Sequence, residues 1–263
     1  MHTAGVADAF RDGAVVLATA WPDAMSDAAL AVGLAWLDAA ERRRRDAFVF
    51  DRDRRLFLAA HALTRALLGA CLGAQPQALS FETDAFGRPH LVARGADAAS
   101  RLVFSLSHTH GFVACAAWRD GQVGVDVEGL ARARDEVALA RSFFAASEAQ
   151  AIERLEGAAR AERFMATWTL KEAYAKARGL GLNLPFTSFE FPEPEASAPQ
   201  VRFVGADDGD GVDGDAARWH FWSRRCGAAH RLALACAGAA RPRVREFEWV
   251  ARASGEHAFA SAA

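Results

Sequence analysis

Two successive rounds of the same pattern constrain the fold of this chain more than any other feature. A helical pattern over residues 27–72, with alanine, leucine and arginine at three- and four-residue spacing, precedes turns and strand-like runs. A second helical pattern over residues 136–176 precedes a glycine-rich turn and further strand-like runs. SFEF at 188–191 also resembles SFET at 80–83. We therefore predict an α+β protein of two pseudo-symmetric lobes, each a long helix on a mainly antiparallel sheet, with the active site in the cleft between them.

The strand-like runs set the expected domain boundaries. Arg119-Asp120-Gly121 predicts a hairpin between the runs at 112–118 and 122–128, because Asp-Gly tolerates positive φ. We expect an N-terminal lobe at residues 1–120, a C-terminal lobe at 121–245, and a C-terminal tail at 246–263 with little structural signal. The other expected strands lie at 14–20, 81–92 (a short pair around Gly87), 102–107, 201–204, 218–223 and 230–236.

Composition excludes several classes of protein. Hydrophobic residues make up 52% and charged residues 24%, as in ordinary globular proteins and unlike disordered ones. A formal net charge of −2 predicts no binding to nucleic acid or to an anionic membrane. The N-terminus lacks a basic start, and its apolar run, AVVLATA, is too short for a signal peptide or a membrane span. The four cysteines show no CxxC spacing, so we expect buried, reduced thiols and a cytoplasmic protein.

Two polar segments have ordinary interpretations. ERRRRDAFVFDRDRR at 41–55 contains seven arginines and four acids, which is typical of a solvated helical face. Some of these arginines can bind phosphate through bidentate contacts. ADDGDGVDGD at 206–215 is acidic and glycine-rich, but it lacks the ligand order of a calcium loop, and we interpret it as a mobile hairpin loop.

The segment GVDVE at 124–128 is the most informative pentapeptide. Side chains alternate along a strand, so Val125 and Val127 point to one face and Asp126 and Glu128 to the other. The α-carbons of the two acids would lie roughly 7 Å apart, where two carboxylates repel unless a cation or solvent lies between them. Oxygen ligands without sulfur suit Mg²⁺. A solvated strand edge is the alternative that this pattern leaves open.

A third carboxylate favours the metal interpretation. Within FMATWTLKEAYAK at 164–176, Glu172 continues an apolar stripe at four-residue steps, after Phe164 and Trp168. A carboxylate in such a stripe is unfavourable unless it is paired or bound to a metal. Lys176 follows one helical turn later, so a surface ion pair between Glu172 and Lys176 is the other interpretation.

Histidines follow the strand at 102–107. In SLSHTHG at 105–111, Ser107 and His108 end a strand, where side chains and backbone N–H groups can meet an anionic ligand. An H-x-H pair on a strand can also bind zinc, which makes His108 and His110 candidate zinc ligands. Thr109-His110-Gly111, however, has the pattern of a turn.

Taken together and in this order, FSLSHT, GVDVE and WTLKEAYAK resemble the 4′-phosphopantetheinyl transferase superfamily, and most of all its larger, two-lobed members. The resemblance covers roughly residues 40–236 and includes the weaker DAFGRPHL segment and the pattern of Phe143, Phe144 and Glu148. Each motif alone is weak, but all of them at these separations are specific. The resemblance implies two α+β lobes that bind coenzyme A between them.

The resemblance also implies roles for particular residues. Asp126, Glu128 and Glu172 match the family's magnesium-binding acids, and Ser107, His108 and Lys176 match residues that contact the phosphates of coenzyme A. Arg88, in FGRP, stands where relatives carry a lysine or arginine near the nucleotide phosphates, and Arg44 lies near a basic position used for the 3′-phosphate. His61 is also a candidate residue for binding coenzyme A, although it departs from the pattern, because many relatives carry arginine there in an R-x-x-x-R pair that ends at Arg65.

The implied activity is the transfer of 4′-phosphopantetheine from coenzyme A to a serine of an acyl, peptidyl or aryl carrier protein, with release of 3′,5′-ADP. Catalysis would use Glu172 as general base, metal ligand or both, together with Lys176 and His108. Mg²⁺ is the expected cofactor, with Mn²⁺ as the alternative cation. The expected partner is a carrier domain serving fatty-acid, polyketide, peptide or lysine biosynthesis, and the transferase is expected to be a monomer because two lobes lie in one chain.

Two other functions remain as alternatives. A coenzyme A-binding or nucleotide-binding module that lost turnover would keep the fold but would not need Glu172. A zinc hydrolase would use His108, His110 and Asp126.

Overall fold

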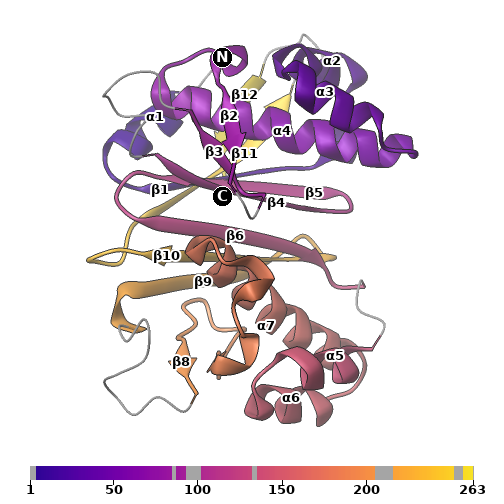
Figure 1. Cartoon of the computed structure of the whole chain (residues 1–263), viewed down its shortest axis with the longest axis vertical. Helices are drawn as coiled ribbons and strands as arrows, with labels where there is room; N and C mark the ends of the chain where they lie inside the picture. Colours follow the sequence, from indigo (N-terminus) through magenta and orange to yellow (C-terminus); the bar gives the residue numbers. More distant parts are fainter. Residues whose placement is uncertain are drawn as a thin grey trace. The chain divides into compact units, whose positions relative to one another are not determined.

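The computed structural model describes residues 4–84, 87–92, 102–131, 135–204, 216–251 and 257–262. The acidic loop predicted at 206–215 lies outside these ranges. The chain forms two compact units (Figure 1). The first lobe comprises Met1–Gly121 together with Pro242–Ala263, and the second lobe comprises Gln122–Arg241.

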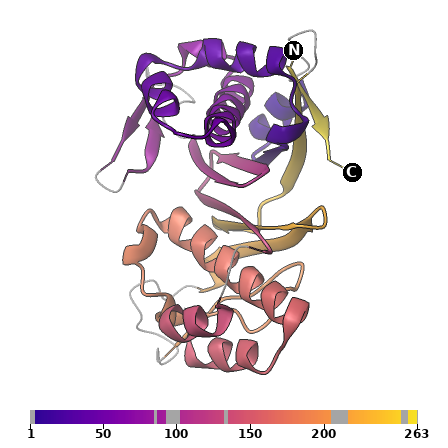
Figure 2. The ribbon, with the colours of Figure 1, turned by 90° about the vertical axis from the view of Figure 1, so that its right-hand side faces the viewer.

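The first lobe is built on a five-stranded sheet with the strand order β12-β11-β1-β5-β4. All neighbours are antiparallel except β1 and β11, which pair in parallel. The long helix α4 (Asp51–Leu72) packs on this sheet (Figure 2). Its residues from Phe57 to Cys71 contribute the largest part of the core. The strands are β1 (Val15–Ala20), β4 (Val103–Thr109), β5 (Phe112–Trp118), β11 (Val244–Ala251) and β12 (His257–Ser261). The remaining elements are α1 (Ala4–Arg11), α2 (Asp27–Trp36), α3 (Ala39–Asp46) and the strand pair β2 (Phe81–Thr83) and β3 (Pro89–Leu91).

The second lobe repeats this plan on a smaller scale. Its antiparallel sheet has the order β6-β10-β9 and is covered by the long helix α7 (Gly157–Arg178). The strands are β6 (Gln122–Gly129), β9 (Trp219–Cys226) and β10 (His230–Ala237). Two short helices, α5 (Glu136–Phe143) and α6 (Ala146–Glu153), and the strand pair β7 (Phe189–Glu190) and β8 (Arg202–Phe203) complete the lobe.

Both long helices end for the same reason. Gly73 after α4 and Gly179 after α7 adopt φ values of 66° and 69°, the left-handed conformation that closes a helix and that glycine tolerates best. By length and hydropathy α4 is sufficient to cross a bilayer, but 78% of its apolar window is buried inside the protein, as expected of a core helix.

The predicted repeat is confirmed in the strand order of the two sheets. In each lobe the strand before the long helix and the first long strand after it flank a shared central strand, which gives β1-β5-β4 in the first lobe and β6-β10-β9 in the second. The segments SFET and SFEF also contribute equivalent short strands, β2 and β7. The α+β class and the long helix on a mainly antiparallel sheet are therefore confirmed, and the cleft between the lobes stays a prediction.

Three expectations need correction. The expected tail at 246–263 instead contains β11 and β12, and Phe247 and Trp249 are buried in the first lobe's core. The expected hairpin at Arg119-Asp120-Gly121 is wrong, because β5 pairs with β1 and β4 whereas β6 pairs with β10. The helical pattern of residues 27–72 forms three helices, separated at Leu37-Asp38 and at 47–50. A local turn signal permits a hairpin, but burial of both strands decides which partner a strand takes.

Candidate functional site

The predicted metal ligands Asp126 and Glu128 lie on the face of β6 that α7 covers. Gly124, Asp126 and Glu128 alternate onto one face of this strand. A Cβ atom added to Gly124 would lie 2.1 Å from the carbonyl oxygen of Ala173 and 2.4 Å from the backbone nitrogen of Ala177. The absence of a side chain at Gly124 therefore lets the backbone of α7 lie directly on β6, beside the two acids.

A direct contact joins the two elements at this place. The Lys176 ammonium on α7 donates a hydrogen bond to Asp126 Oδ1 at 2.6 Å, and Asp126 is only 4% exposed. Glu172 is half-buried and precedes Lys176 by four residues, so both lie on the same side of α7. Glu128, also half-buried, follows Asp126 on the same face of β6. The structure therefore brings Asp126 and Lys176 together and places the two glutamates on the same pair of packed elements.

These residues suit a hard divalent cation in their chemistry. The donor atoms are carboxylate oxygens, the kind that Mg²⁺ prefers, and Asp126 Oδ1 already holds a positively charged group. Within the described residues, no group of three histidine, cysteine or acidic side chains is close enough to form a metal site. The ligand set Asp126, Glu128 and Glu172 thus stays a prediction that the chemistry of the donors supports.

An arginine outside the predicted site residues lies across the sheet from Glu128. Arg231 on β10 is the register partner of Glu128 on β6 and is 4% exposed. Its guanidinium forms an ion pair with Glu162 of α7 and donates to Ser223 Oγ at 2.9 Å. The signal in the sequence was an arginine in the apolar strand HRLALACA, but only the register reveals that it lies opposite Glu128.

A second group of predicted residues lines a pocket of about 600 Å³ in the first lobe. Arg44 and His61 contribute its basic groups. Apolar side chains from the strands form another part of the wall, and hydroxyl and carboxyl groups complete it. The lining residues are Asp38, Ala40, Glu41, Arg44, His61, Thr64, Phe81, Glu82, Thr83, Pro89, Phe104 and Leu106.

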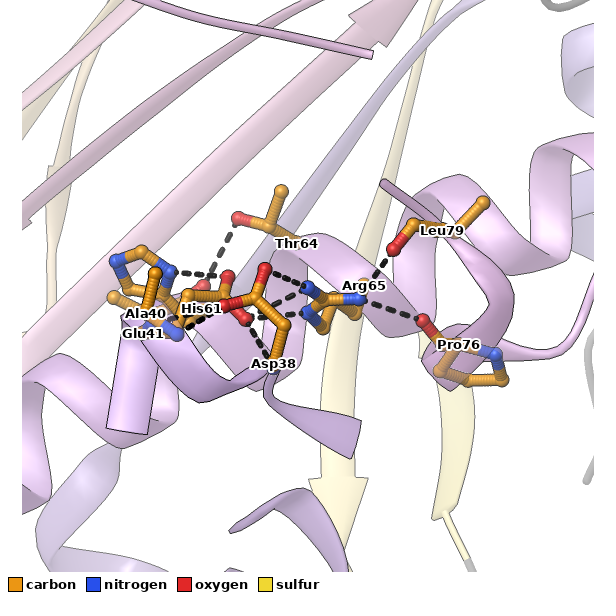
Figure 3. A network of polar contacts seen from close by, with 9 residues as sticks. Asp38, Ala40, Glu41, His61, Thr64, Arg65, Pro76 and Leu79 are labelled. Atoms are coloured by element: carbon orange, nitrogen blue, oxygen red, sulfur yellow. Dashed lines mark hydrogen bonds and ion pairs between the residues drawn. The ribbon is translucent and has the colours of Figure 1, made fainter. Parts of the chain in front are cut away.

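A network of charged side chains under this pocket fixes its basic edge (Figure 3). His61 Nδ1 lies 2.8 Å from Glu41 Oε1, and the Arg65 guanidinium donates to Glu41 Oε2 at 2.7 Å and 2.9 Å. Burial by itself would raise the pKa of Glu41, but the hydrogen bonds from His61 and Arg65 outweigh it and lower that pKa to about 2. Glu41 is therefore an anion that holds His61 in place.

Arg65 is buried, and its guanidinium donates to other groups of the protein. It is 1% exposed, and besides Glu41 it donates to the backbone carbonyls of Pro76 at 3.1 Å and Leu79 at 2.8 Å. In the R-x-x-x-R pattern expected of relatives, this position would be paired with a second arginine. Here Arg65 is committed to the protein itself, and His61 and Arg44 are the basic side chains that line the pocket.

The predicted residues of β4 and of the β2–β3 hairpin lie along the same pocket. Phe104 and Leu106 line it, and His108, which is exposed, continues their row on one face of β4. Ser107 is buried and points to the opposite face. Arg88 directly precedes Pro89 of the pocket wall and donates to the Phe104 carbonyl at 3.4 Å; burial lowers its pKa, although Asp84 opposes this.

The structure does not place His108 and His110 as a pair of zinc ligands. The predicted turn between β4 and β5 consists of His110 and Gly111, with Gly111 at a φ of 78°, while Thr109 is the last residue of β4. His110 therefore lies in the turn, and it does not share a strand face with His108 as an H-x-H zinc pair requires.

Two family models match this chain one after the other. The model for the N-terminal part of 4′-phosphopantetheinyl transferase matches residues 19–120, and the model for the 4′-phosphopantetheinyl transferase superfamily matches residues 122–236. The chain belongs to the 4′-phosphopantetheinyl transferase superfamily. The two matches also divide the chain between Asp120 and Gln122, next to the boundary of its two lobes.

Individual relatives of the chain carry related names. It is 36% identical over 139 residues to the 4′-phosphopantetheinyl transferase HetI of Nostoc sp., which covers 53% of this chain and 58% of the relative. It is 34% identical over 149 residues to the L-aminoadipate-semialdehyde dehydrogenase-phosphopantetheinyl transferase of Eremothecium gossypii, over 55% of this chain and 50% of the relative. A 4′-phosphopantetheinyl transferase of Bacillus subtilis is 25% identical over 57% of this chain and 64% of the relative. The matched region thus spans between half and two thirds of each relative's length.

The second lobe contains a further buried ion pair next to Glu172. Lys171 Nζ lies 2.8 Å from Glu148 Oε2 on α6, and it also donates to the carbonyls of Phe186 and Phe189. Burial lowers the pKa of Lys171 and raises that of Glu148, while their mutual attraction opposes both shifts. The motif WTLKEAYAK therefore has two uses: Lys171 anchors α7 inside the lobe, and Glu172 and Lys176 lie on its partly exposed side.

Proposed function

We propose that this chain transfers the 4′-phosphopantetheine group of coenzyme A to a serine of an acyl, peptidyl or aryl carrier protein. The observation that carries the proposal is the acidic face of β6 with α7 packed directly on it through Gly124. On these two elements lie Asp126, Glu128 and Glu172, at the positions of the family's acidic motifs, with Lys176 in contact with Asp126.

The first-lobe pocket suits the nucleotide end of the donor. Arg44 and His61 supply positive or hydrogen-bonding groups for a phosphate, and Phe81, Phe104 and Pro89 supply flat or apolar surface for an adenine ring. The anionic Glu41 holds His61 from below by its Nδ1 atom, which leaves Nε2 as the other ring nitrogen available for a ligand. In this proposal the 3′-phosphoadenosine part of coenzyme A occupies the pocket.

In this proposal the second-lobe residues neutralise the negative charge of the phosphates of coenzyme A. A bound Mg²⁺, held by Asp126, Glu128 and Glu172, would neutralise the pyrophosphate of coenzyme A. Lys176 offsets negative charge that grows on the phosphates during transfer. His108, exposed at the end of the pocket-lining row of β4, donates to a phosphate oxygen.

The transfer step is an in-line displacement at phosphorus. The serine oxygen of the carrier protein forms a bond to the β-phosphorus of coenzyme A, and the bond from that phosphorus to the oxygen bridging it to the α-phosphorus breaks. The electron pair of the broken bond leaves with 3′,5′-ADP. Glu172 accepts the serine proton as general base.

A mass-spectrometric loading assay tests this proposal. Purified enzyme is incubated with coenzyme A, Mg²⁺ and an apo carrier domain, and the carrier domain should gain the mass of phosphopantetheine. Asp126→Ala and Glu172→Gln should abolish the gain while circular dichroism shows an unchanged fold. His108→Ala should mainly raise the KM for coenzyme A. Loading retained by Asp126→Ala would refute the role of the acids, and coenzyme A binding without any loading by the wild type would indicate a binding module instead.

Dependence on Mg²⁺, a monomeric state and a cytoplasmic location form part of the same proposal. Within the described residues, Cys71, Cys115, Cys226 and Cys236 are buried thiols, which supports a reducing compartment. Loading after removal of divalent cations with EDTA, and after re-addition of Mg²⁺ or Mn²⁺, tests the metal dependence directly.

A further inference from the structure

Three consecutive large apolar residues are exposed in the connection between α3 and α4. Phe48, Val49 and Phe50, here called the FVF patch, are 39%, 80% and 58% exposed. Ala47 before them is exposed as well. A run of adjacent exposed apolar side chains is unfavourable in a globular protein unless it has a function, most often a contact with a partner.

The backbone presents the FVF patch in a defined way. The Phe48 N–H donates to the Arg45 carbonyl at 3.2 Å, and the Phe50 carbonyl accepts from the Asp53 N–H at 3.0 Å at the start of α4. The Phe48 ring contacts the Phe57 ring, with 5.6 Å between their centroids. Phe48 therefore attaches the patch to α4, while Val49 and Phe50 are exposed to solvent.

Arginines flank the patch on both sides in the sequence. Residues 42–45 are four consecutive arginines, and three more follow at Arg52, Arg54 and Arg55, against four acids in the same stretch of residues 41–55. The Arg52 guanidinium lies 5.0 Å from the centre of the Phe50 ring, and Arg43 is exposed. Aromatic and arginine side chains are the types enriched at protein interfaces, and a positive rim selects an acidic partner.

The FVF patch also adjoins the proposed donor pocket. Phe57, whose ring contacts the ring of Phe48, stacks on His61 with 4.0 Å between the ring centroids. The Arg44 guanidinium also contacts Phe57 and lies 5.8 Å from the centre of its ring. Both Arg44 and His61 line the pocket. A partner seated on the patch would thus lie next to the pocket that we assign to coenzyme A.

We propose that the FVF patch and its arginine rim form the docking surface for the carrier domain that accepts the phosphopantetheine group, and that the docked face of this domain is acidic. This inference rests on the proposed function and adds the place where the protein substrate binds. Val49 and Phe50 pack against apolar side chains of the carrier domain, and the arginines face its carboxylates.

Other occupants fit the observations less well. In a symmetric dimer through this patch the arginine rim of one copy would face the arginine rim of the other, which is repulsive. Membrane binding usually needs an amphipathic helix with a broad apolar face, whereas this connection offers three apolar residues and is flanked by Asp46, Asp51 and Asp53.

Steady-state kinetics with a purified apo carrier domain test the docking surface. The double variant Val49→Ser/Phe50→Ser should raise the KM for the carrier domain about tenfold, because it removes the two most exposed anchors, and leave the KM for coenzyme A and the kcat unchanged. Arg43→Glu should raise the carrier KM in the same direction, and more strongly at low salt. Val204→Ser and Arg245→Glu, at exposed positions away from the patch in the sequence, are the matched controls and should change neither constant.

Calorimetry with a carrier domain whose acceptor serine is alanine measures docking separately from turnover. Weaker binding by the double variant supports the inference, and equal binding overturns it. A wild-type enzyme that loads no carrier refutes the proposed function, whereas loading with an unchanged carrier KM in the double variant refutes only the docking surface. A dimer in sedimentation, or binding to vesicles of phosphatidylglycerol, that the double variant abolishes without a change in carrier KM would assign the patch to a second copy or to a membrane.

Discussion

Glu41 shows how one carboxylate can organise both a helix start and a binding pocket. Its Oε2 atom accepts from the backbone N–H of Asp38, the N-cap of α3, while the Asp38 side chain accepts from the Glu41 N–H in return. The same side chain holds His61 at the pocket and Arg65 in the core. A single residue thus couples the start of α3 to α4.

Acid sensitivity follows from the pKa of Glu41. This pKa is lowered to about 2, below the ordinary value of 4.5, so the folded state binds the Glu41 proton less tightly than the unfolded state does. The corresponding stability is fully present above about pH 4.5 and is lost as pH falls towards 2. Urea unfolding at several pH values should show wild type losing more stability over this window than Glu41→Gln. Parallel curves for the two proteins would contradict the argument.

His61 should govern recognition of the donor's phosphate. His61→Ala removes a side chain that lines the pocket, so we expect the KM for coenzyme A to rise several-fold and the KM for dephospho-coenzyme A to change little. His61→Gln is the control for shape, because its amide can still donate to Glu41 without carrying a charge. If both donors lose affinity equally in His61→Ala, the 3′-phosphate does not contact this residue.

At the scale of elements, the two long helices are held by equivalent buried ion pairs. Arg65 on α4 and Lys171 on α7 each lie fourteen residues after the first residue of their helix. Each pairs with the glutamate at the third position of a short helix, Glu41 of α3 and Glu148 of α6. Each cation also donates to two backbone carbonyls in the segment that leads into the short strand, before β2 in the first lobe and up to the first residue of β7 in the second. The repeat therefore extends from strand order to individual contacts.

The pair in the second lobe allows a test of what such contacts contribute. Lys171→Met leaves Glu148 buried without its cation, so it should lower the free energy of unfolding by about 3–5 kcal/mol. The double variant Lys171→Met/Glu148→Leu removes both charges and should recover most of that loss. Chemical denaturation of the three proteins measures this, and a double variant less stable than the single one would show that the hydrogen bonds Glu148 accepts from the Ala145 and Phe191 N–H groups outweigh the cost of its unpaired charge.

Contact between α7 and β6 depends on one glycine. Gly124→Ala would push a Cβ atom into backbone atoms of Ala173 and Ala177, which cannot rotate away, so α7 must shift from the strand. We expect a loss of stability of about 3 kcal/mol or more, with loss of carrier loading. Gly129→Ala on the same strand is the matched control, because its nearest neighbour would be the Ala229 carbonyl oxygen at 3.9 Å. Equal stability of the two variants would contradict the close packing.

At the scale of the whole molecule, the chain leaves the first lobe after Gly121, builds the second lobe, and returns at Pro242. The returning strand β11 pairs in parallel with β1 from Val15 to Thr19. It contributes Phe247 and Trp249 to the first lobe's core. The first lobe is therefore incomplete until the C-terminal segment has been made.

Truncation after Arg241 should accordingly destabilise the first lobe more than the second. Without β11 and β12, β1 becomes an edge strand and the core loses two large side chains. Hydrogen exchange followed by mass spectrometry should show lost protection in β1 and α1, with protection of β6 and β10 retained. The substitution Phe247→Ala in the full chain is a milder version and should act in the same direction.

Much of this protein follows from local sequence periodicity. The long helices, the strands at 14–20, 102–107 and 112–118, and the shared face of Asp126 and Glu128 all depend on side-chain spacing, which neighbouring residues alone set. The repeat of the pattern gave the α+β class and the two related lobes, and the ordered motifs gave the family.

Other features depend on contacts between distant residues, which no local pattern encodes. Strand pairing turned an expected tail into β11 and β12 and replaced the expected hairpin at 119–121 by pairing of β6 with β10. Burial committed Arg65 to Glu41 and backbone carbonyls and left His61 at the pocket. Spacing placed Asp126 and Glu128 on one face, but only the close approach of α7 at Gly124 decided which helix covers that face and that Lys176 meets Asp126 there.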